Sequence, residues 1–383
     1  MSLSYYIRKR FNNAYILGKC ILFAFQKGRA QKEISNPKKI LIFQPAQMGD
    51  MVCTTPLFRA VKRQYPQVHL YVMGKAINKE LLVGNKDIDE YLVYSSRLSS
   101  IINMLQGRGI DFACVTSPNF LPLAALYLTG IPCIAVPKIT GFSPYETKSF
   151  KILRHLAITK PHRMGHYAPK EYLRLLEPIG ISTDDTKKHL VFSKDANLRI
   201  NNLFQEHNVQ TSKFIVGIAP SAGNKIKMWG RDKFAQVADH IYQKYNAQIV
   251  ILGGNNDKNE VQEMLKHLDP ETKVINFQGL LSIEELKAVI SHLNLLISVD
   301  SGPIYIAEAF SVPTIDIVGP IDENEQPPIG KLHRIVKANR KKPELYVMNA
   351  RMYNREEAQR QTNAITVEMV INEFEDLFKL LKS

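Results

Sequence analysis

Cysteine is scarce in this sequence, and the few cysteines form no pattern. Cys20, Cys53, Cys114 and Cys133 stand far apart, and no two of them make a C-x-x-C pair. A disulfide framework needs paired cysteines, and a structural zinc site needs clustered thiols or histidines. We therefore expect neither kind of stabilisation, and we expect the cysteines to be reduced core thiols of a cytoplasmic protein.

The common nucleotide-binding signatures are also absent. Neither G-x-G-x-x-G nor G-x-x-x-x-G-K-[ST] occurs, which removes the main support for a dinucleotide-dependent dehydrogenase or a P-loop enzyme. No cluster of His, Cys and carboxylate residues has the spacing of metal ligands, so we expect no metal site and no bound cofactor. The apolar stretch from Ala14 to Phe25 is interrupted by Lys19 and is too short to span a bilayer.

Acidic residues are scarce at two places in the chain. The 383 residues include 50 Lys and Arg against 36 Asp and Glu. Residues 1–39 hold nine basic residues and one acid, and residues 331–360 hold nine basic residues and three acids. Such blocks predict an anionic partner, and both nucleic acid and anionic lipid fit the charge alone.

Residues 1–36 form a basic N-terminal segment. Arg8-Lys9-Arg10 precede the interrupted apolar stretch, and no cleavage site for a signal peptidase follows it. Two interpretations are open. The segment is either an amphipathic helix that lies in the interface of an anionic membrane, or a surface helix that packs on the domain after it.

Apolar strands and amphipathic helices then alternate in two sets. The first set begins at Lys39–Gln44 and the second at Phe214–Ala219. This alternation predicts an α/β protein built from βαβ units with parallel sheets. We expect an N-terminal domain over residues 37–190 and a C-terminal domain over residues 191–345. We expect residues 346–383 to be a helical segment that packs back toward the N-terminal domain.

The stretch from Leu295 to Pro320 carries the clearest local signal. The apolar run Leu295–Val299 is followed by Asp300-Ser301-Gly302 and by Pro303, which is favoured at the first position of a helix. A helix N-terminus at the carboxyl end of a parallel strand is a site for a phosphate or diphosphate. An ordinary capped helix gives the same pattern. By contrast, residues 138–163 mix Pro, Gly and basic residues and predict a functional loop region.

Three stretches occur in the order and at the distances of a known family. They are QPAQMGDMVCTTPLFRAVKRQYP after the first strand, GIAPSAGNKIKMWGRDKFAQVADHI at the start of the second set, and SVDSGPIYIAEAFSVPTIDIVGP near its end. Together they resemble the heptosyltransferase family of glycosyltransferases (glycosyltransferase family 9) over roughly residues 38–325. The resemblance implies a GT-B architecture, in which two Rossmann-like parallel-sheet domains face each other across a cleft. It also implies that the N-terminal domain binds the acceptor and the C-terminal domain the nucleotide-sugar.

The resemblance implies a specific activity as well. The expected reaction is an inverting, metal-independent transfer of a heptose from ADP-heptose to a lipid-linked acceptor of the lipopolysaccharide inner core. The expected location is the inner face of the bacterial inner membrane, with peripheral contact to anionic lipid rather than nucleic acid. Another nucleotide-sugar donor or glycan acceptor stays open, and so does a nucleotide-sugar epimerase or hydrolase.

The general base of the family matches Asp50, and Gly49 and Thr54 of the same motif lie on the acceptor side. An inverting transfer needs one carboxylate to take the proton of the acceptor hydroxyl. Alternatively, Asp50 caps a helix that begins at Met51, where a carboxylate is stabilised in any case.

The phosphate-binding lysine of the family matches Lys227, and its ribose-binding carboxylate matches Asp257. A lysine charge stabilises a leaving diphosphate. The alternatives are a solvated loop lysine and a helix cap. The other residues with an implied role in donor binding are Ser221, Ala222, Trp229, Asp300, Ser301, Gly302 and Tyr305. Tyr305 and Ala219 stand where the family commonly has His, and a tyrosine carries no positive charge near neutral pH.

Overall fold

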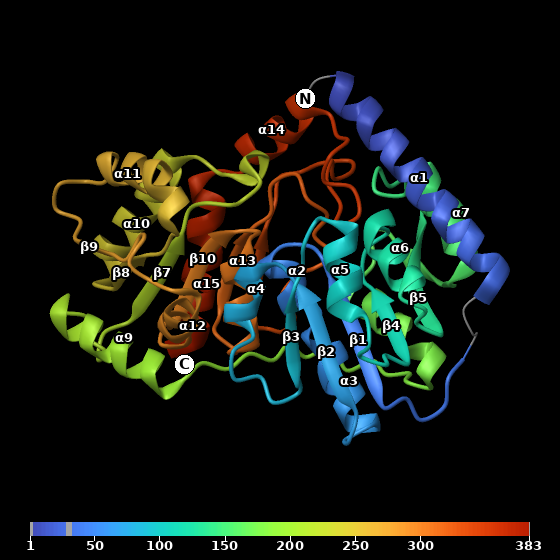
Figure 1. The fold of residues 1–383 in the computed structure, drawn as a ribbon. Helices are drawn as coiled ribbons and strands as arrows, with labels where there is room; N and C mark the ends of the chain where they lie inside the picture. Colours follow the sequence, from blue (N-terminus) through green and yellow to red (C-terminus); the bar gives the residue numbers. More distant parts are fainter. Residues whose placement is uncertain (1–2, 28–32, 383) are drawn as a thin grey trace. The chain divides into compact units, whose positions relative to one another are not determined.

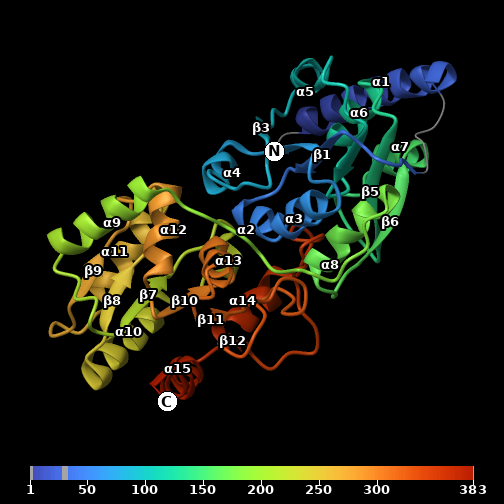
Figure 2. The same ribbon diagram turned by 90° about the horizontal axis from the view of Figure 1, so that it is seen from below.

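The computed structural model describes residues 3–27 and 33–382. The chain forms two compact units, unit 1 with Met1–Lys79 and Asn85–Lys187, and unit 2 with Glu80–Gly84 and Lys188–Ser383. Each unit contains one six-stranded parallel sheet, and helices cover both faces of each sheet (Figures 1 and 2). The predicted α/β class with two parallel-sheet domains is confirmed. The main division of the chain falls after Lys187 rather than after residue 190.

The sheet of unit 1 has the strand order β3-β2-β1-β4-β5-β6. Its strands are β1 (Lys39–Gln44), β2 (His69–Gly74), β3 (Glu90–Val93), β4 (Phe112–Val115), β5 (Cys133–Thr140) and β6 (Ile158–Arg163). Because β1 and β4 are neighbours, the chain leaves β1 toward one edge of the sheet and β4 toward the other. This is the strand order of Rossmann-like folds.

Helices pack on both faces of this sheet. They are α1 (Leu3–Lys27), α2 (Met48–Val52), α3 (Thr55–Gln64), α4 (Ala76–Leu81), α5 (Leu98–Leu105), α6 (Phe120–Leu128), α7 (Lys148–Leu153) and α8 (Ala168–Leu173), with 3-10 turns at η1 (Arg154–Leu156) and η2 (Arg174–Ile179). Leu41 and Phe43 of β1 pack with Ile101 of α5 and Leu123 of α6. The helix α1 adds Ile16 and Cys20 to the same core, so the N-terminal segment is part of unit 1.

The prediction of a loop over residues 138–163 is wrong. The strand β5 continues to Thr140, α7 follows, and β6 pairs in parallel with β5 from Ile158 to Arg163. The sequence ITKPHR shows no apolar alternation and contains Pro161. Proline is tolerated in an edge strand, where one side needs no ladder of hydrogen bonds, and β6 is such an edge.

The sheet of unit 2 has the order β12-β11-β10-β7-β8-β9. Its strands are β7 (Ile215–Ala219), β8 (Gln248–Ile251), β9 (Val274–Asn276), β10 (Leu295–Val299), β11 (Thr314–Ile317) and β12 (His333–Val336). Taken from β9, these are the third, second, first, fourth, fifth and sixth strands of the unit. Both units therefore have the same Rossmann-like topology.

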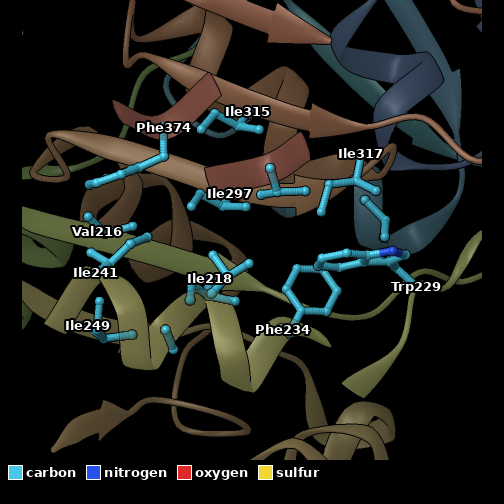
Figure 3. Close-up of a cluster of buried hydrophobic side chains, with 14 of the residues drawn as sticks. Val216, Ile218, Trp229, Phe234, Ile241, Ile249, Ile297, Ile315, Ile317 and Phe374 are labelled. Atoms are coloured by element: carbon cyan, nitrogen blue, oxygen red, sulfur yellow. The ribbon is translucent and has the colours of Figure 1, made fainter. Parts of the chain in front are cut away.

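The helices of unit 2 are α9 (Lys194–Glu206), α10 (Arg231–Tyr245), α11 (Lys258–Lys266), α12 (Ile283–Ser291), α13 (Gly302–Ala309), α14 (Arg355–Asn363) and α15 (Val367–Lys382), with 3-10 turns at η3 (Lys225–Lys227) and η4 (Asn255–Asp257). One core cluster joins the sheet to α10 and α15 (Figure 3). In it, Ile297 and Ile315 of the sheet lie with Ile241 of α10 and Phe374 of α15.

The C-terminal helix α15 is part of the core of unit 2. Val370, Phe374 and Leu377 of α15 are fully buried in the core of unit 2, against the face of the sheet that α10 also covers. The sequence shows that this helix has one apolar face, but it does not show which surface covers that face. Residues 346–383 thus complete unit 2 instead of forming a separate segment.

Candidate functional site

The topology of unit 2 marks a site at the ends of β7 and β10. These strands are neighbours, and the chain turns from them toward opposite edges of the sheet. In open parallel sheets, ligands bind beyond the carboxyl ends of the strands at such a switch point. Here the loop from Pro220 to Gly230 follows β7, and Asp300 follows β10. This arrangement brings together residues that lie about 70 positions apart in the sequence.

Lys227 and Asp300 form the centre of this site. Lys227 lies in the turn η3, and its Nζ donates to the backbone carbonyl of Asp300 at 3.1 Å and to the Asp300 carboxylate. The hydroxyl of Tyr305 donates to the other oxygen of the same carboxylate. The Lys227 side chain is 18% exposed and the Asp300 side chain 7%. The lysine therefore stands at the edge of the site and is held by a nearly buried acid.

The helix α13 begins beside this pair. Ser301 is its N-cap residue, and Gly302 and Pro303 open its first turn, as the sequence predicted. The Oγ atom of Ser301 lies 3.2 Å from the Oγ atom of Ser298. The Ser298 hydroxyl donates to the carbonyl of Ala219 at the end of β7. The first N–H groups and the dipole of α13 thus meet Lys227 at one end of the sheet, where both favour an anion.

Trp229 does not belong to the ligand surface, so the expected donor contact is wrong. Its side chain is 1% exposed and packs edge-on against Phe234 in the core (Figure 3). Its indole N–H donates to the carbonyl of Ile365 at 2.9 Å. Trp229 therefore anchors the loop after β7 to the segment between α14 and α15, and its role in the motif is to fix the backbone near Lys227.

The other predicted donor residues differ in position. Ser221 and Ala222 are half-buried in the loop after β7 that also carries Lys227, and Ala222 packs against the core cluster of unit 2. Asp257 is half-buried at the end of β8, and its carboxylate accepts a hydrogen bond from the N–H of Gly254 at 2.8 Å. The cap interpretation of Asp257 thus describes a real contact, which uses one of its two carboxylate oxygen atoms.

Asp50 lies in the corresponding loop of unit 1, after β1. The helix α2 begins at Met48 rather than at Met51, and a separate helix α3 begins at Thr55, so the single helix expected here is two helices. Asp50 is the third residue of α2, and its carboxylate accepts from the N–H of Gln47 at 3.2 Å. The capping interpretation therefore holds, with the carboxylate inside the first turn instead of before it.

Thr54, predicted on the acceptor side, supports this loop from within unit 1. Its side chain is fully buried, and its hydroxyl donates to the carbonyl of Asp50 at 2.7 Å. Gln44, which the sequence analysis missed, donates to the Thr54 hydroxyl at 2.8 Å. The sequence signal for Gln44 was a polar residue directly after the four apolar residues of β1. Gly49 stays half-buried within α2.

A second residue that the sequence analysis missed is Asp316 of β11. It lies in the apolar stretch TIDIV, where a carboxylate is out of place, and it is 1% exposed. Burial raises the pKa of the Asp316 carboxyl well above its ordinary value, and the nearby charge of Asp300 raises it further. The positive charge of Lys227 lowers this pKa, but by less than burial raises it.

Comparisons with known proteins agree with this architecture. Residues 117–353 match the family described as glycosyltransferase family 9 (heptosyltransferase). The chain is 24% identical to lipopolysaccharide heptosyltransferase 3 of Escherichia coli K12, over 72% of this chain and 80% of that protein. It is 20% identical to lipopolysaccharide heptosyltransferase 2 of the same strain, over 78% and 88%.

Solved structures give the same result for the fold. A family 9 glycosyltransferase from Veillonella parvula superposes with a TM-score of 0.71 at 20% identity, covering 93% of this chain and 99% of that one. The E. coli ADP-heptose lipopolysaccharide heptosyltransferase II also gives 0.71, at 18% identity, with 90% and 100% covered. The two Rossmann-like units are those of a GT-B enzyme, and the chain belongs to glycosyltransferase family 9, the heptosyltransferases.

Proposed function

We propose that this glycosyltransferase moves a heptose from ADP-heptose onto an acceptor of the lipopolysaccharide inner core. The proposal is carried by the Lys227–Asp300 pair beside the first turn of α13, at the switch point of unit 2. The relatives named above act on lipopolysaccharide by their names, and one structure of this fold is an E. coli heptosyltransferase with ADP-2-deoxy-2-fluoro heptose. The transfer inverts the anomeric centre and requires no metal ion.

The residues of unit 2 take up the leaving group in this proposal. As the bond between the sugar and the diphosphate breaks, negative charge grows on the diphosphate. Lys227 supplies a point charge to it, and the N-terminus of α13 supplies N–H donors and a favourable dipole. The oxygen atom of Asp257 that does not cap its turn accepts a hydrogen bond from the ribose. Ser221 and Ala222 provide polar groups of the loop after β7.

Asp50 of unit 1 acts as the general base. It takes the proton of the acceptor hydroxyl as that oxygen attacks the anomeric carbon. One carboxylate oxygen is held by the N–H of Gln47, which fixes the side chain in one orientation. The loop is fixed in turn by Gln44 and Thr54, so that the base sits on a rigid support. A fixed base lowers the entropic cost of reaching the transition state.

A different nucleotide-sugar donor is the second candidate, and Tyr305 is the observation that favours it. The family commonly has a histidine at this position, whereas Tyr305 is buried and its hydroxyl is bonded to Asp300. The site therefore has one potential positive charge fewer beside the diphosphate. An epimerase or hydrolase that uses the sugar nucleotide alone would release nucleotide without any acceptor.

Calorimetry with ADP-heptose, GDP-mannose and UDP-glucose separates these candidates. We expect ADP-heptose to bind at least about tenfold more tightly than the other two, and nucleotide release to require a core acceptor. If GDP-mannose or UDP-glucose binds more tightly than ADP-heptose, the sugar that the enzyme transfers is not heptose. Rapid nucleotide release without any acceptor would replace the transfer by hydrolysis or epimerisation.

The helix α1 supports peripheral contact with the membrane that carries such an acceptor. Among the described residues, no helix is long and apolar enough to cross a bilayer. One side of α1 packs on α6 and α7 through Ile16 and Cys20. The opposite side carries large apolar side chains that are mostly exposed, namely Phe11 at 73%, Tyr15 at 64%, Leu22 at 68% and Phe25 at 85%.

These four residues form one stripe along the helix, because positions 11, 15, 22 and 25 are separated by near-multiples of a helical turn. Arg10 and Lys19 flank the stripe, and the described part of α1 has no acidic residue. The side chains of Arg8 and Lys9, and all of Arg29, lie outside the described residues. An apolar stripe with basic flanks is typical of a helix that lies in the interface of an anionic membrane.

Replacing Phe11, Tyr15, Leu22 and Phe25 together by Ser is expected to lower partitioning onto anionic vesicles by at least about tenfold. The four changes leave Ile16 and Cys20 in place, so that α1 still packs on unit 1. Co-sedimentation with phosphatidylglycerol vesicles across a salt series measures the effect. The matched control changes Asn12 and Gln26, two exposed polar residues of α1, to Ser. If the stripe variant pellets as well as the control, α1 is only a packed surface helix.

A further inference from the structure

The Asp316 carboxyl lies on the face of the sheet that α13 covers. Its neighbours Ile315 and Ile317 point into the core cluster on the other face (Figure 3). Because successive side chains of a strand alternate between faces, Asp316 points the opposite way. It is level with Ser298 of β10, which is two residues before Asp300 on the same face. Asp316 thus lies on the same face of the sheet as Asp300, two residues before it along the strand direction.

The lysines around this position are already paired. Lys227 binds the Asp300 carboxylate, and Lys188, whose side chain is fully buried, binds Glu308 of α13 at 2.5 Å. Glu308 also accepts from the N–H of Ile329 at 3.0 Å. By contrast, the Oδ1 atom of Asp316 is buried and has no hydrogen bond among the residues that the structure describes, neither from a lysine nor from a backbone N–H.

Charge balance therefore makes Asp316 the neutral member of this group. Two lysines and two carboxylates, Asp300 and Glu308, cancel each other, and a third ionised carboxylate would be a buried charge without a partner. An unpaired buried charge is costly, and an acid at such a position keeps its proton instead. The raised pKa of the Asp316 carboxyl, caused first by burial, agrees with this count.

The remaining groups around Asp316 do not change the balance. Tyr305 of α13 is buried and donates its hydroxyl to Asp300. His333 of β12 bonds to Thr314, on the same face of β11, and burial lowers the pKa of His333 to about 4. At neutral pH this imidazole is uncharged. Lys227, Asp300 and Glu308 are then the charges that act on Asp316, and the pair with Lys188 balances the charge of Glu308.

We propose that Asp316 is a positioning residue of the diphosphate site. Because Asp316 stays neutral, Asp300 is the one ionised carboxylate from which Lys227 has to separate when it binds a diphosphate. In the structure Lys227 is bound to Asp300, so it has to turn from that acid to reach a diphosphate. An ionised Asp316 on the same face of the sheet would hold the lysine in place and would repel the diphosphate. This inference rests on the proposed role of Lys227 in donor binding, and it assigns the buried acid a function in that step.

The substitution Asp316→Asn tests the inference, because an amide has the shape of a protonated carboxyl and no charge. Binding of ADP and of inorganic pyrophosphate is measured by calorimetry between pH 7 and pH 9.5. We expect the variant to bind both as tightly as the wild type at pH 7. With rising pH the affinity of the wild type is expected to fall toward a slope of about tenfold per pH unit, while that of the variant stays flatter.

Thermodynamic stability gives a readout that does not depend on the donor. The folded pKa of Asp316 lies above its unfolded value, so the unfolded chain releases this proton first as the pH rises. The contribution of the carboxyl to stability is therefore complete below about pH 4 and is lost progressively above it, until the folded pKa is reached. We expect the unfolding constant of Asp316→Asn to be at least about tenfold below that of the wild type at pH 8, with the gap closing toward pH 5.

The outcomes separate this inference from the proposed function. The control is Asp376→Asn on α15, an exposed acid with only a surface pair to Lys379. If Asp316→Asn is less stable than the wild type at pH 8, Asp316 is an ionised partner in the fold, and the inference fails. If the variant is more stable but neither ADP nor pyrophosphate binds the wild type, the neutral state is correct and the role in donor binding is wrong. If the affinities of the wild type and of Asp316→Asn change with pH in the same way, the role of Asp316 in donor binding is also wrong.

Discussion

An Asp50→Asn enzyme is expected to lose sugar transfer by about 10²- to 10⁴-fold, with donor affinity unchanged within a few-fold. The loss is that of a general base, because an amide cannot take the proton of the acceptor hydroxyl. Donor affinity is expected to stay because the residues proposed to bind the nucleotide-sugar belong to unit 2, whereas Asp50 belongs to unit 1. Single-turnover transfer and donor calorimetry on the same preparation measure the two quantities.

The structure allows this substitution to separate two roles of Asp50. In the cap, the carboxylate accepts a hydrogen bond from the N–H of Gln47, and the amide oxygen of an asparagine accepts the same bond. The fold of α2 should therefore survive, and only the chemistry should be lost. Asp50→Ala removes both roles and should also lower the melting temperature. Near-normal turnover by a folded Asp50→Asn enzyme would leave Asp50 as a helix cap and no more.

Much of the fold could be predicted where the local sequence decides the local structure. The strands β1 and β10 have the bounds that their apolar patterns predict. Ser282 followed three residues later by Glu285 is the sequence pattern of a capping box, and in α12 both of its hydrogen bonds are present. In such elements the period of the apolar residues and the cap chemistry agree, so that few alternatives remain.

The features that escaped prediction depend on partners far away in the chain. The strand β12 spans only four residues, His333–Val336, and pairs with β11 at the edge of the sheet, where pattern signals are weak. Trp229 resembled a ligand residue because it lies in a family motif, but its indole finds its partner at Ile365. The neutral state of Asp316 likewise follows from the pairing of lysines and acids that only the folded chain brings together.

The sequence places Lys227 and Asp300 in one candidate site, but it does not give their contacts. The sequence indicates that Lys227 and Asp300 belong to one site, since both match motifs of the family. It does not show that they bind each other, because 73 residues separate them. Their ion pair changes the expected energetics, since a diphosphate has to compete with Asp300 for the lysine.

Lys227→Ala is expected to weaken binding of ADP and ADP-heptose and to slow transfer. A charge-assisted hydrogen bond contributes about 1.5–3 kcal/mol, which corresponds to roughly 10- to 150-fold in affinity. The lower part of this range is expected here, because the lysine gives up its bond to Asp300 when it turns to the diphosphate. Transfer should slow further, because the negative charge on the leaving diphosphate is greater in the transition state than in the bound donor.

The matched control is Lys225→Ala, two residues earlier in the same turn. Its side chain is 83% exposed and is paired with Glu260 on the surface, so its removal changes the same local charge without emptying the site. Lys227→Ala also leaves the Asp300 carboxylate without its cation, so melting temperatures are compared before affinities are interpreted. Lys227→Arg restores the charge and should recover part of the affinity. If Lys227→Ala and Lys225→Ala bind ADP equally well, Lys227 is a structural partner of Asp300, and the diphosphate binds elsewhere.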